Sequence, residues 1–145
     1  MENILNITWE VYKPINERYE EVEKEIERIR EQGEIYEDGK DRELYKSLIY
    51  ESIDLRRKVT EMRPHLIPEV GVPCTVHFYS DRSSGYVLKV ISPKKILVKM
   101  DGIYTGTKIF TYRRNGHWVQ FGTTSRDWGT LCTLGYRSNY YDREF

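Results

Sequence analysis

Residues 110–121 have the sequence FTYRRNGHWVQF. Asn-Gly is the dipeptide most typical of a two-residue turn between antiparallel strands, because both residue types tolerate positive φ angles. Strand-forming residues flank it on both sides, over residues 108–113 and 117–121. The segment predicts a β-hairpin whose loop is Asn115 and Gly116.

A two-residue loop also sets the register of this hairpin. Residues at equal distance from the loop pair across the strands: Arg114 with His117, Arg113 with Trp118, Tyr112 with Val119 and Phe110 with Phe121. Side chains alternate between the faces of a strand, so the expected core face consists of Phe110, Tyr112, Val119 and Phe121. Arg113 and Trp118 are then an exposed pair, which either holds a nucleobase or only stabilises the hairpin.

The rest of the second half of the chain has the two-residue period of strands. Cys74, Val76 and Phe78 alternate with polar or aromatic neighbours over residues 74–79. Further strands are predicted at residues 86–91, 96–100 and 130–136, and Ser92-Pro93-Lys94-Lys95 has the composition of a turn. Several short strands with both faces partly apolar predict a small antiparallel barrel or sandwich.

The first half has the period of helices. Pro14 suits the first turn of a helix and Gly33 its end, and the apolar residues between them follow the 4-3-4-3 spacing of a coiled coil: Ile15, Tyr19, Val22, Ile26 and Ile29. A second helix is predicted from Asp41 to just before Pro64. We expect the helix over residues 14–32 and this second helix to form an antiparallel hairpin.

The second helix has an apolar face wider than one narrow seam, made of Leu44, Tyr45, Leu48, Ile49, Leu55, Val59 and Met62. A helix over residues 14–32 cannot cover all of Leu48, Leu55, Val59 and Met62, so we expect at least a dimer. The predicted fold class is α+β: an N-terminal helical hairpin for oligomerisation over residues 1–69, and a small antiparallel β-barrel or sandwich for ligand binding over residues 70–145.

The zero net charge of the chain is an average over two unlike halves. Residues 1–69 hold 12 Lys and Arg against 18 Asp and Glu, whereas residues 70–145 hold 11 against 5. The aromatic residues are divided in the same sense, with six before residue 70 and 13 from there on. A basic segment rich in aromatic side chains can stack a base and neutralise its phosphate, so we expect an anionic partner.

Several other functions lack the residues they require. No apolar run is long enough to span a membrane, and the N-terminus lacks the pattern of a signal peptide, so a cytoplasmic location is expected. Cys74 and Cys132 lie in apolar alternating segments and are interpreted as reduced core thiols, with no metal site. No phosphate-binding loop, dinucleotide fingerprint, zinc-protease motif or catalytic triad pattern is present, so we expect a binding protein without a cofactor and not an enzyme.

Three stretches together resemble a bacteriophage family: CTVHFYSDRSSGYVLKVISPKKILVKMDG, FTYRRNGHWVQFG and LGYRSNYYDREF. Over residues 71–145, and with a helical hairpin before them, they are similar to the first-described Thoeris anti-defence family. The chain departs from the family in its short connection over residues 100–108 and in Ser83-Ser84 after Arg82.

This resemblance implies a protein that sequesters the immune signal glycosyl-cyclic ADP-ribose without degrading it, in the cytoplasm of the infected bacterial host. Related members also accept cyclic oligonucleotides. The resemblance further implies homodimers that build larger assemblies, up to hexamers, with ligand pockets between protomers.

Six residues are predicted to bind the ligand. Arg82, Arg113 and Arg126 are expected to contact its phosphates, because each can leave the core without strain and a guanidinium suits phosphate better than an ammonium group does. Tyr79 or Trp118 is expected to stack on the base, and Arg57 to close the site from a neighbouring chain.

Two alternatives stay open from the sequence. The basic, aromatic face also suits a small β-barrel module that binds single-stranded nucleic acid, whose affinity would depend steeply on salt. A purely structural phage protein, in which the helices only assemble, would bind no small molecule.

Overall fold

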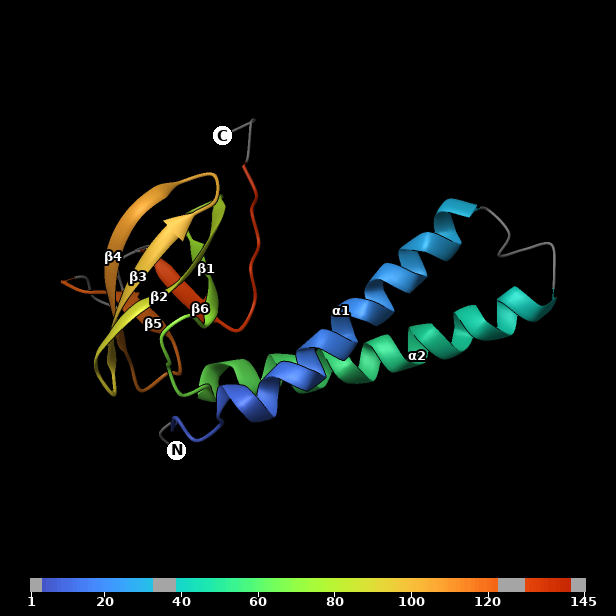
Figure 1. Ribbon diagram of the computed structural model, residues 1–145, viewed down its shortest axis with the longest axis horizontal. Coiled ribbons are helices and arrows are strands. Elements are labelled where there is room, and N and C mark those ends of the chain that lie inside the picture. The colour runs from blue at the N-terminus through green and yellow to red at the C-terminus, as the bar shows by residue number, and fades with distance from the viewer. Residues whose placement is uncertain (1–3, 33–38, 123–129, 142–145) are drawn as a thin grey trace. The chain divides into compact units, whose positions relative to one another are not determined.

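The computed structural model describes residues 4–32, 39–122 and 130–141, which form two helices followed by a closed six-stranded antiparallel β-barrel (Figure 1). This confirms the α+β fold class, and of the two predicted architectures it is the barrel. The chain divides into two compact units: Glu10–Glu61 forms one, and the segments before and after it form the other. Ile7 joins the second unit because its N–H donates to His65 O and its carbonyl accepts from Ile67 N. None of the described helices has the length and apolarity needed to cross a membrane.

The helical unit consists of α1, Trp9–Gln32, and α2, Gly39–Met62. The first helix starts five residues earlier than predicted and runs through Pro14. A proline near the helix start loses only one backbone hydrogen bond, here to the carbonyl of Glu10, and its fixed φ is helical, so it does not mark the first turn. α2 ends just before Pro64, as predicted, and a 3-10 turn, Arg63–His65, follows.

The core of this unit uses the predicted seam. Val22, Ile26 and Ile29 of α1 pack with Leu48 of α2, and partly buried side chains complete the cluster: Tyr45, Ile49 and Leu55. Val59 is also buried and Met62 half-buried, so the argument that four residues of the second helix need another chain to cover them is wrong. α1 is also longer than predicted, and its buried residues begin at Tyr12, ahead of the predicted start.

The barrel consists of strands β1, Pro73–His77; β2, Arg82–Ser92; β3, Lys95–Asp101; β4, Thr105–Tyr112; β5, Trp118–Gln120; and β6, Leu131–Leu134. Each strand pairs with the next, and β6 closes the barrel on β1 through the pairs Cys74↔Leu134 and Val76↔Cys132. Both cysteines are free and buried, as predicted. Burial raises the pKa of the Cys132 thiol, and its contact with Cys74 adds to that.

The predicted hairpin forms, but its loop is one residue longer than the Asn-Gly signal indicates. Arg113 N–H donates to His117 O at 2.9 Å and Gly116 N–H to Arg113 O at 3.0 Å, while Gly116 has φ of 85°. Tyr112 therefore pairs with Trp118 instead of Val119. The loop is a tight turn ended by a left-handed glycine, which is the usual form of three-residue hairpin loops.

This shift of one residue changes the pairing across the hairpin, so that Trp118 lies opposite Tyr112 and is buried together with Val119. Trp118 is 2% exposed and packs on the ring of Tyr112 at a centroid distance of 5.2 Å, whereas Phe121 is 56% exposed. The predictions of an exposed Arg113–Trp118 pair and of a core Phe121 are wrong for this reason. Phe110, Tyr112 and Val119 are buried, as predicted.

Candidate functional site

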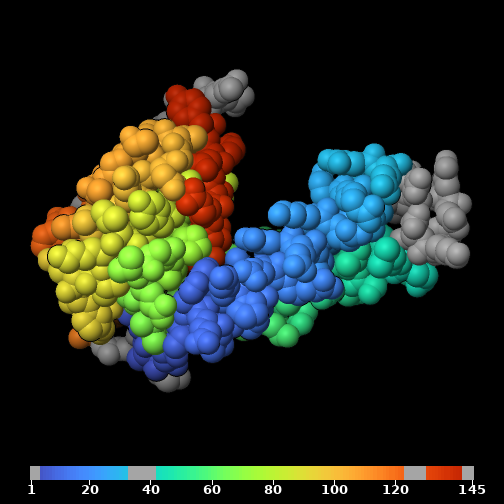
Figure 2. Space-filling model, viewed as in Figure 1, coloured from blue at the N-terminus to red at the C-terminus, as the bar shows by residue number. Residues whose placement is uncertain are grey.

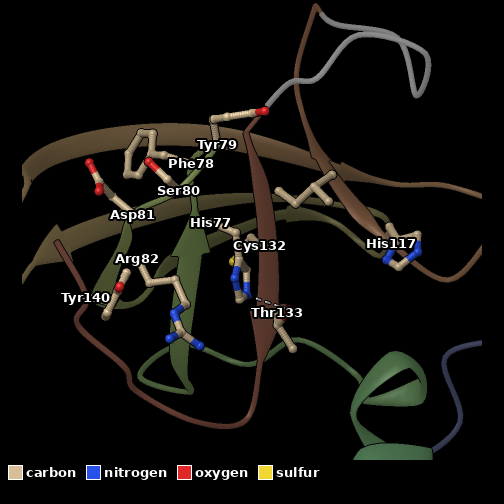
Figure 3. A pocket seen from close by; sticks show the side chains of 11 residues that line it. His77, Phe78, Tyr79, Ser80, Asp81, Arg82, His117, Cys132, Thr133 and Tyr140 are labelled. Atoms are coloured by element: carbon tan, nitrogen blue, oxygen red, sulfur yellow. Dashed lines mark hydrogen bonds between the residues drawn. The ribbon is translucent and has the colours of Figure 1, made fainter. Parts of the chain in front are cut away.

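A pocket of about 440 Å³ lies at the turn between β1 and β2, beside β6 (Figure 3). Its lining comes from residues 77–82, from residues 131–133 of β6, and from His117 and Tyr140. Two of the predicted ligand-binding residues, Tyr79 and Arg82, belong to this lining. His117 comes from the hairpin loop and lies across the pocket from Arg82 (Figure 3).

The β1–β2 turn that carries these residues is held in place by its own hydrogen bonds. Phe78 N–H donates to Asp81 O at 2.9 Å, and the Tyr104 hydroxyl donates to Asp81 Oδ2 at 2.5 Å. The rings of Phe78 and Tyr104 pack at a centroid distance of 4.7 Å. The hydrogen bond to Asp81 raises the pKa of Tyr104, so this hydroxyl stays a donor at neutral pH. Asp81 therefore stabilises the turn.

Arg82 is the cation of the pocket. It begins β2, and its backbone exchanges two hydrogen bonds of 2.8 Å with the backbone of Tyr140. Its guanidinium lies 5.3 Å from the centroid of the Tyr140 ring. In Figure 3 the side chains of Asp81 and Arg82 point away from each other. Because strand neighbours face opposite sides, the turn keeps this carboxylate apart from the arginine.

Two exposed phenol rings accompany this arginine. Tyr79 is 67% exposed and Tyr140 49% exposed, and both line the pocket. Tyr79 lies on the hydrogen-bonded β1–β2 turn, and Tyr140 lies on the backbone bridge to Arg82, so the backbone that carries each ring is held in place. A guanidinium and two accessible aromatic rings that line one pocket can bind an anion and a planar ring system together.

His77 forms the inner side of the pocket. Its Nε2 lies 2.9 Å from Thr133 Oγ1 and 3.5 Å from the hydroxyl of Tyr136. Burial lowers the pKa of His77, and the positive charge of Arg82 lowers it further. The imidazole is therefore neutral at pH 7. The bond to Thr133 links His77 of β1 to β6.

The C-terminal segment over residues 135–141, called the strap below, brings Tyr140 to the pocket. In Figure 2 the strap, in red, lies against β2–β4, in yellow to orange. Arg137 forms a bidentate ion pair with Asp101: its two terminal nitrogens donate to Oδ2 at 3.0 Å and to Oδ1 at 2.7 Å. Burial raises the pKa of Asp101, but the hydrogen bonds from Arg137 and Ser84 outweigh it and the pKa is lowered.

Asn139 makes the second attachment of the strap. Its Oδ1 accepts from Ser84 N–H at 3.0 Å and from Ile103 N–H at 3.1 Å. A Cβ at Gly102 would lie only 1.9 Å from that oxygen, so glycine is required there. At the start of the strap, the guanidinium of Arg63 covers the ring of Tyr136 at 4.1 Å. These contacts fix the strap at both ends and between them.

The structure does not bring the six predicted residues together. Arg113 is exposed on the hairpin and is absent from the lining of the pocket, and Trp118 is buried in the barrel. Arg57 belongs to the helical unit, where it forms an ion pair with Asp54 at 2.9 Å. Arg126 lies outside the described residues.

Sequence reasoning missed Tyr140 and His77 as pocket residues. The only available signal for Tyr140 was the terminal string NYYD, which has no periodicity and no partner along the chain. Its position depends on the side chains of Arg137 and Asn139 finding Asp101 and Ser84 in other strands.

Comparison with protein-family models, with curated proteins and with solved structures finds no match to the chain. Within residues 4–32, 39–122 and 130–141, no group of three His, Cys, Asp or Glu side chains is placed to hold a metal ion. The pocket is therefore interpreted from its own geometry. It has one guanidinium, two accessible rings, the neutral imidazole of His77 and the hydroxyl groups of Ser80 and Thr133, together with the His117 ring and the Asp81 carboxylate, which accepts from Tyr104.

Proposed function

We propose that this protein binds a cyclic ADP-ribose-type signalling nucleotide in the pocket and sequesters it intact, as a phage inhibitor of Thoeris immunity. The observation that carries the proposal is that Arg82, whose guanidinium lies 5.3 Å from the Tyr140 ring, lines the same pocket of about 440 Å³ as the exposed ring of Tyr79. That volume lies within the range of small-molecule sites, about 300–1,000 Å³. The resemblance of residues 71–145 to the anti-defence family supplies the ligand class.

Each group of the pocket has a role in this proposal. The Arg82 guanidinium binds the diphosphate through charge-assisted hydrogen bonds, which suit its planar fork. Tyr140 or Tyr79 stacks on the adenine, as an exposed ring does for any base. Neutral His77 and Thr133 offer hydrogen bonds to ribose hydroxyls and add no charge. Binding of this kind breaks no bond in the ligand, so the signal is held and the defence effector does not receive it.

The binding free energy that sequestration requires favours a site completed by a second chain. A sequestering protein needs a dissociation constant near ~10 nM, or about -11 kcal/mol. One charge-assisted contact contributes about 1.5–3 kcal/mol and one stacked base about 1–3 kcal/mol, before the cost of association. One pocket with a single arginine falls short of that total. The proposal therefore includes at least a homodimer, to which a neighbouring chain adds cations such as Arg57.

Native mass spectrometry of the purified protein with cyclic ADP-ribose isomers tests this function. The expected result is a complex with one of them, from which heat denaturation releases a nucleotide of unchanged mass. Cyclic di- and trinucleotides form the comparison set. Release of a hydrolysed product would show an enzyme instead, and the absence of any complex would contradict the proposed function.

A further inference from the structure

A second hollow, of about 350 Å³, lies on strands β3 and β4 beside the end of β5. Its lining is Leu97, Thr107, Lys108, Ile109, Gln120 and Phe121. β5 pairs with β4 only over residues 110–112 of β4. Beyond that pairing, Phe121 N–H donates to Ile109 O at 2.7 Å. The hollow forms where β5 stops and none of its residues lies in the pocket around Arg82.

The floor and one wall of this hollow are apolar and accessible. Leu97 and Ile109 pair across β3 and β4, so their side chains share one face of the sheet, and both are half-buried. The backbone bond to Ile109 places Phe121 next in the same row, with 56% of it exposed. Single exposed apolar residues are common, but three in one row make a continuous surface. Its size and flatness suit the face of a nucleobase.

Lysines surround this apolar row. Lys95 and Lys99 flank Leu97 on the same face of β3, about 13 Å apart by the rise of a strand, and Lys89 pairs with Leu97 from β2. The Lys95 Nζ lies 4.0 Å from the centroid of the Phe121 ring. Asp101, the carboxylate on this face of β3, is engaged by the fork of Arg137. The face therefore carries a row of positive charges around an accessible ring.

We propose that this hollow binds single-stranded nucleic acid, with one base against Phe121 and the Leu97–Ile109 floor and the phosphates along Lys95 and Lys99. Lysines are flexible point charges that neutralise a backbone without defining one geometry, whereas a small anion is better held by an arginine fork. The lysine row also extends to both sides of the hollow, beyond the length of one nucleotide. Stacking on an accessible ring beside a basic strip is the usual arrangement for strands bound without sequence preference.

Fluorescence anisotropy with a labelled 12-nucleotide oligo(dT) tests this site. Phe121→Ala is expected to weaken binding by about 5- to 150-fold, the loss of one stacked base, and Phe121→Tyr to retain it. The matched control is Tyr141→Ala, which removes another exposed ring of the barrel unit, 60% exposed, and is expected to leave oligo(dT) binding unchanged. The double variant Lys95→Ala/Lys99→Ala is expected to lower the salt slope by about 1.4, for two phosphates of a single strand.

Each other outcome has a defined meaning. Oligo(dT) binding that is unchanged in Phe121→Ala, or that is absent at 50 mM salt, would overturn the proposal. So would displacement of oligo(dT) by thymidine monophosphate at equal nucleotide concentration, which would indicate a mononucleotide site. Arg82→Ala is expected to leave oligo(dT) binding intact, so failure of this site and failure of the proposed signal-binding function are distinguishable. Thermal melting of each variant checks that it is folded.

Discussion

Arg82 is the single residue on which the proposed nucleotide pocket depends most. Its guanidinium is exposed beside the ring of Tyr140. The hydrogen bonds that join Arg82 to the strap come from its backbone. Replacing Arg82 with Ala should therefore weaken nucleotide binding by about 10- to 150-fold, the loss of one charge-assisted contact. Calorimetry would measure this, and the melting temperature of the free protein should change little.

The matched control for this variant is Arg114→Ala. Arg114 is an exposed arginine of the same barrel, in the hairpin loop, and it does not line the pocket. Equal losses of affinity in both variants would mean that only the total charge matters, and that the pocket is assigned to the wrong residues.

Titration of the single residue His77 should make the free energy of unfolding depend on pH. Its pKa in the folded protein is below the ordinary value of 6.5, so the unfolded chain binds the proton more readily. The free energy of unfolding should be highest above pH 6.5 and fall as the pH decreases through that value toward the lower pKa of the folded state. Urea denaturation between pH 7.5 and 5.5 would detect this.

His77→Gln is the variant that checks the assignment, because it keeps a hydrogen-bonding side chain without titrating. Its free energy of unfolding should be nearly independent of pH over the same interval. A slope as steep as that of the wild type would assign the effect to another group.

At the scale of elements, the strap is expected to control the pocket from a distance. In Gly102→Ala the new Cβ would occupy the position of Asn139 Oδ1, so the strap must leave and carry Tyr140 away. The same Cβ would lie 2.8 Å from the backbone nitrogen of Ser84 in β2, so thermal melting of this variant checks that the barrel is folded. We expect nucleotide affinity to fall as strongly as in Arg82→Ala, with faster hydrogen exchange at the amide of Tyr140.

Ser92→Ala is a suitable control for the strap, because Ser92 is exposed at the end of β2. It should leave both the affinity and the exchange rate unchanged. Full nucleotide affinity in Gly102→Ala would show that the strap and Tyr140 take no part in the site.

At the scale of the whole molecule, the proposed function requires association of chains. The residues first expected to mediate it are largely covered, but Tyr50 and Ile53 are 69% and 62% exposed and lie three residues apart on α2, which places them on one face. Ile53→Glu should convert the expected dimer to a monomer without unfolding the helices. Sedimentation equilibrium at micromolar concentration would measure this, with Val11→Glu, at an exposed apolar residue of α1, as a control for added negative charge. A monomeric wild-type protein would contradict the prediction.

The spacing of apolar residues along the sequence correctly predicted both helices, the strands on either side of the Asn-Gly loop and the burial of the two cysteine thiols. This works because the 3.6-residue and two-residue periods are local properties of the backbone. The start of α1 was misplaced because Pro14 is compatible with two positions in a helix. The candidate site was predicted less well: Tyr79 and Arg82 line the pocket, whereas Arg113 and Trp118 do not. Arg126 lies outside the described residues, and Arg57 was expected from a neighbouring chain.

Tertiary structure alone decided the remaining features. One extra residue in the hairpin loop exchanged the positions of Trp118 and Phe121, and that choice depends on how β5 fits between β4 and β6. Tyr140 reaches Arg82 only because Arg137 and Asn139 find partners far away in the chain. Such contacts leave no period in the sequence: they are hydrogen bonds between segments that meet only after the barrel has closed. The sequence by itself determined which segments are helices and strands and which half of the chain is basic and aromatic, and closure of the barrel determined which of those side chains face a common pocket.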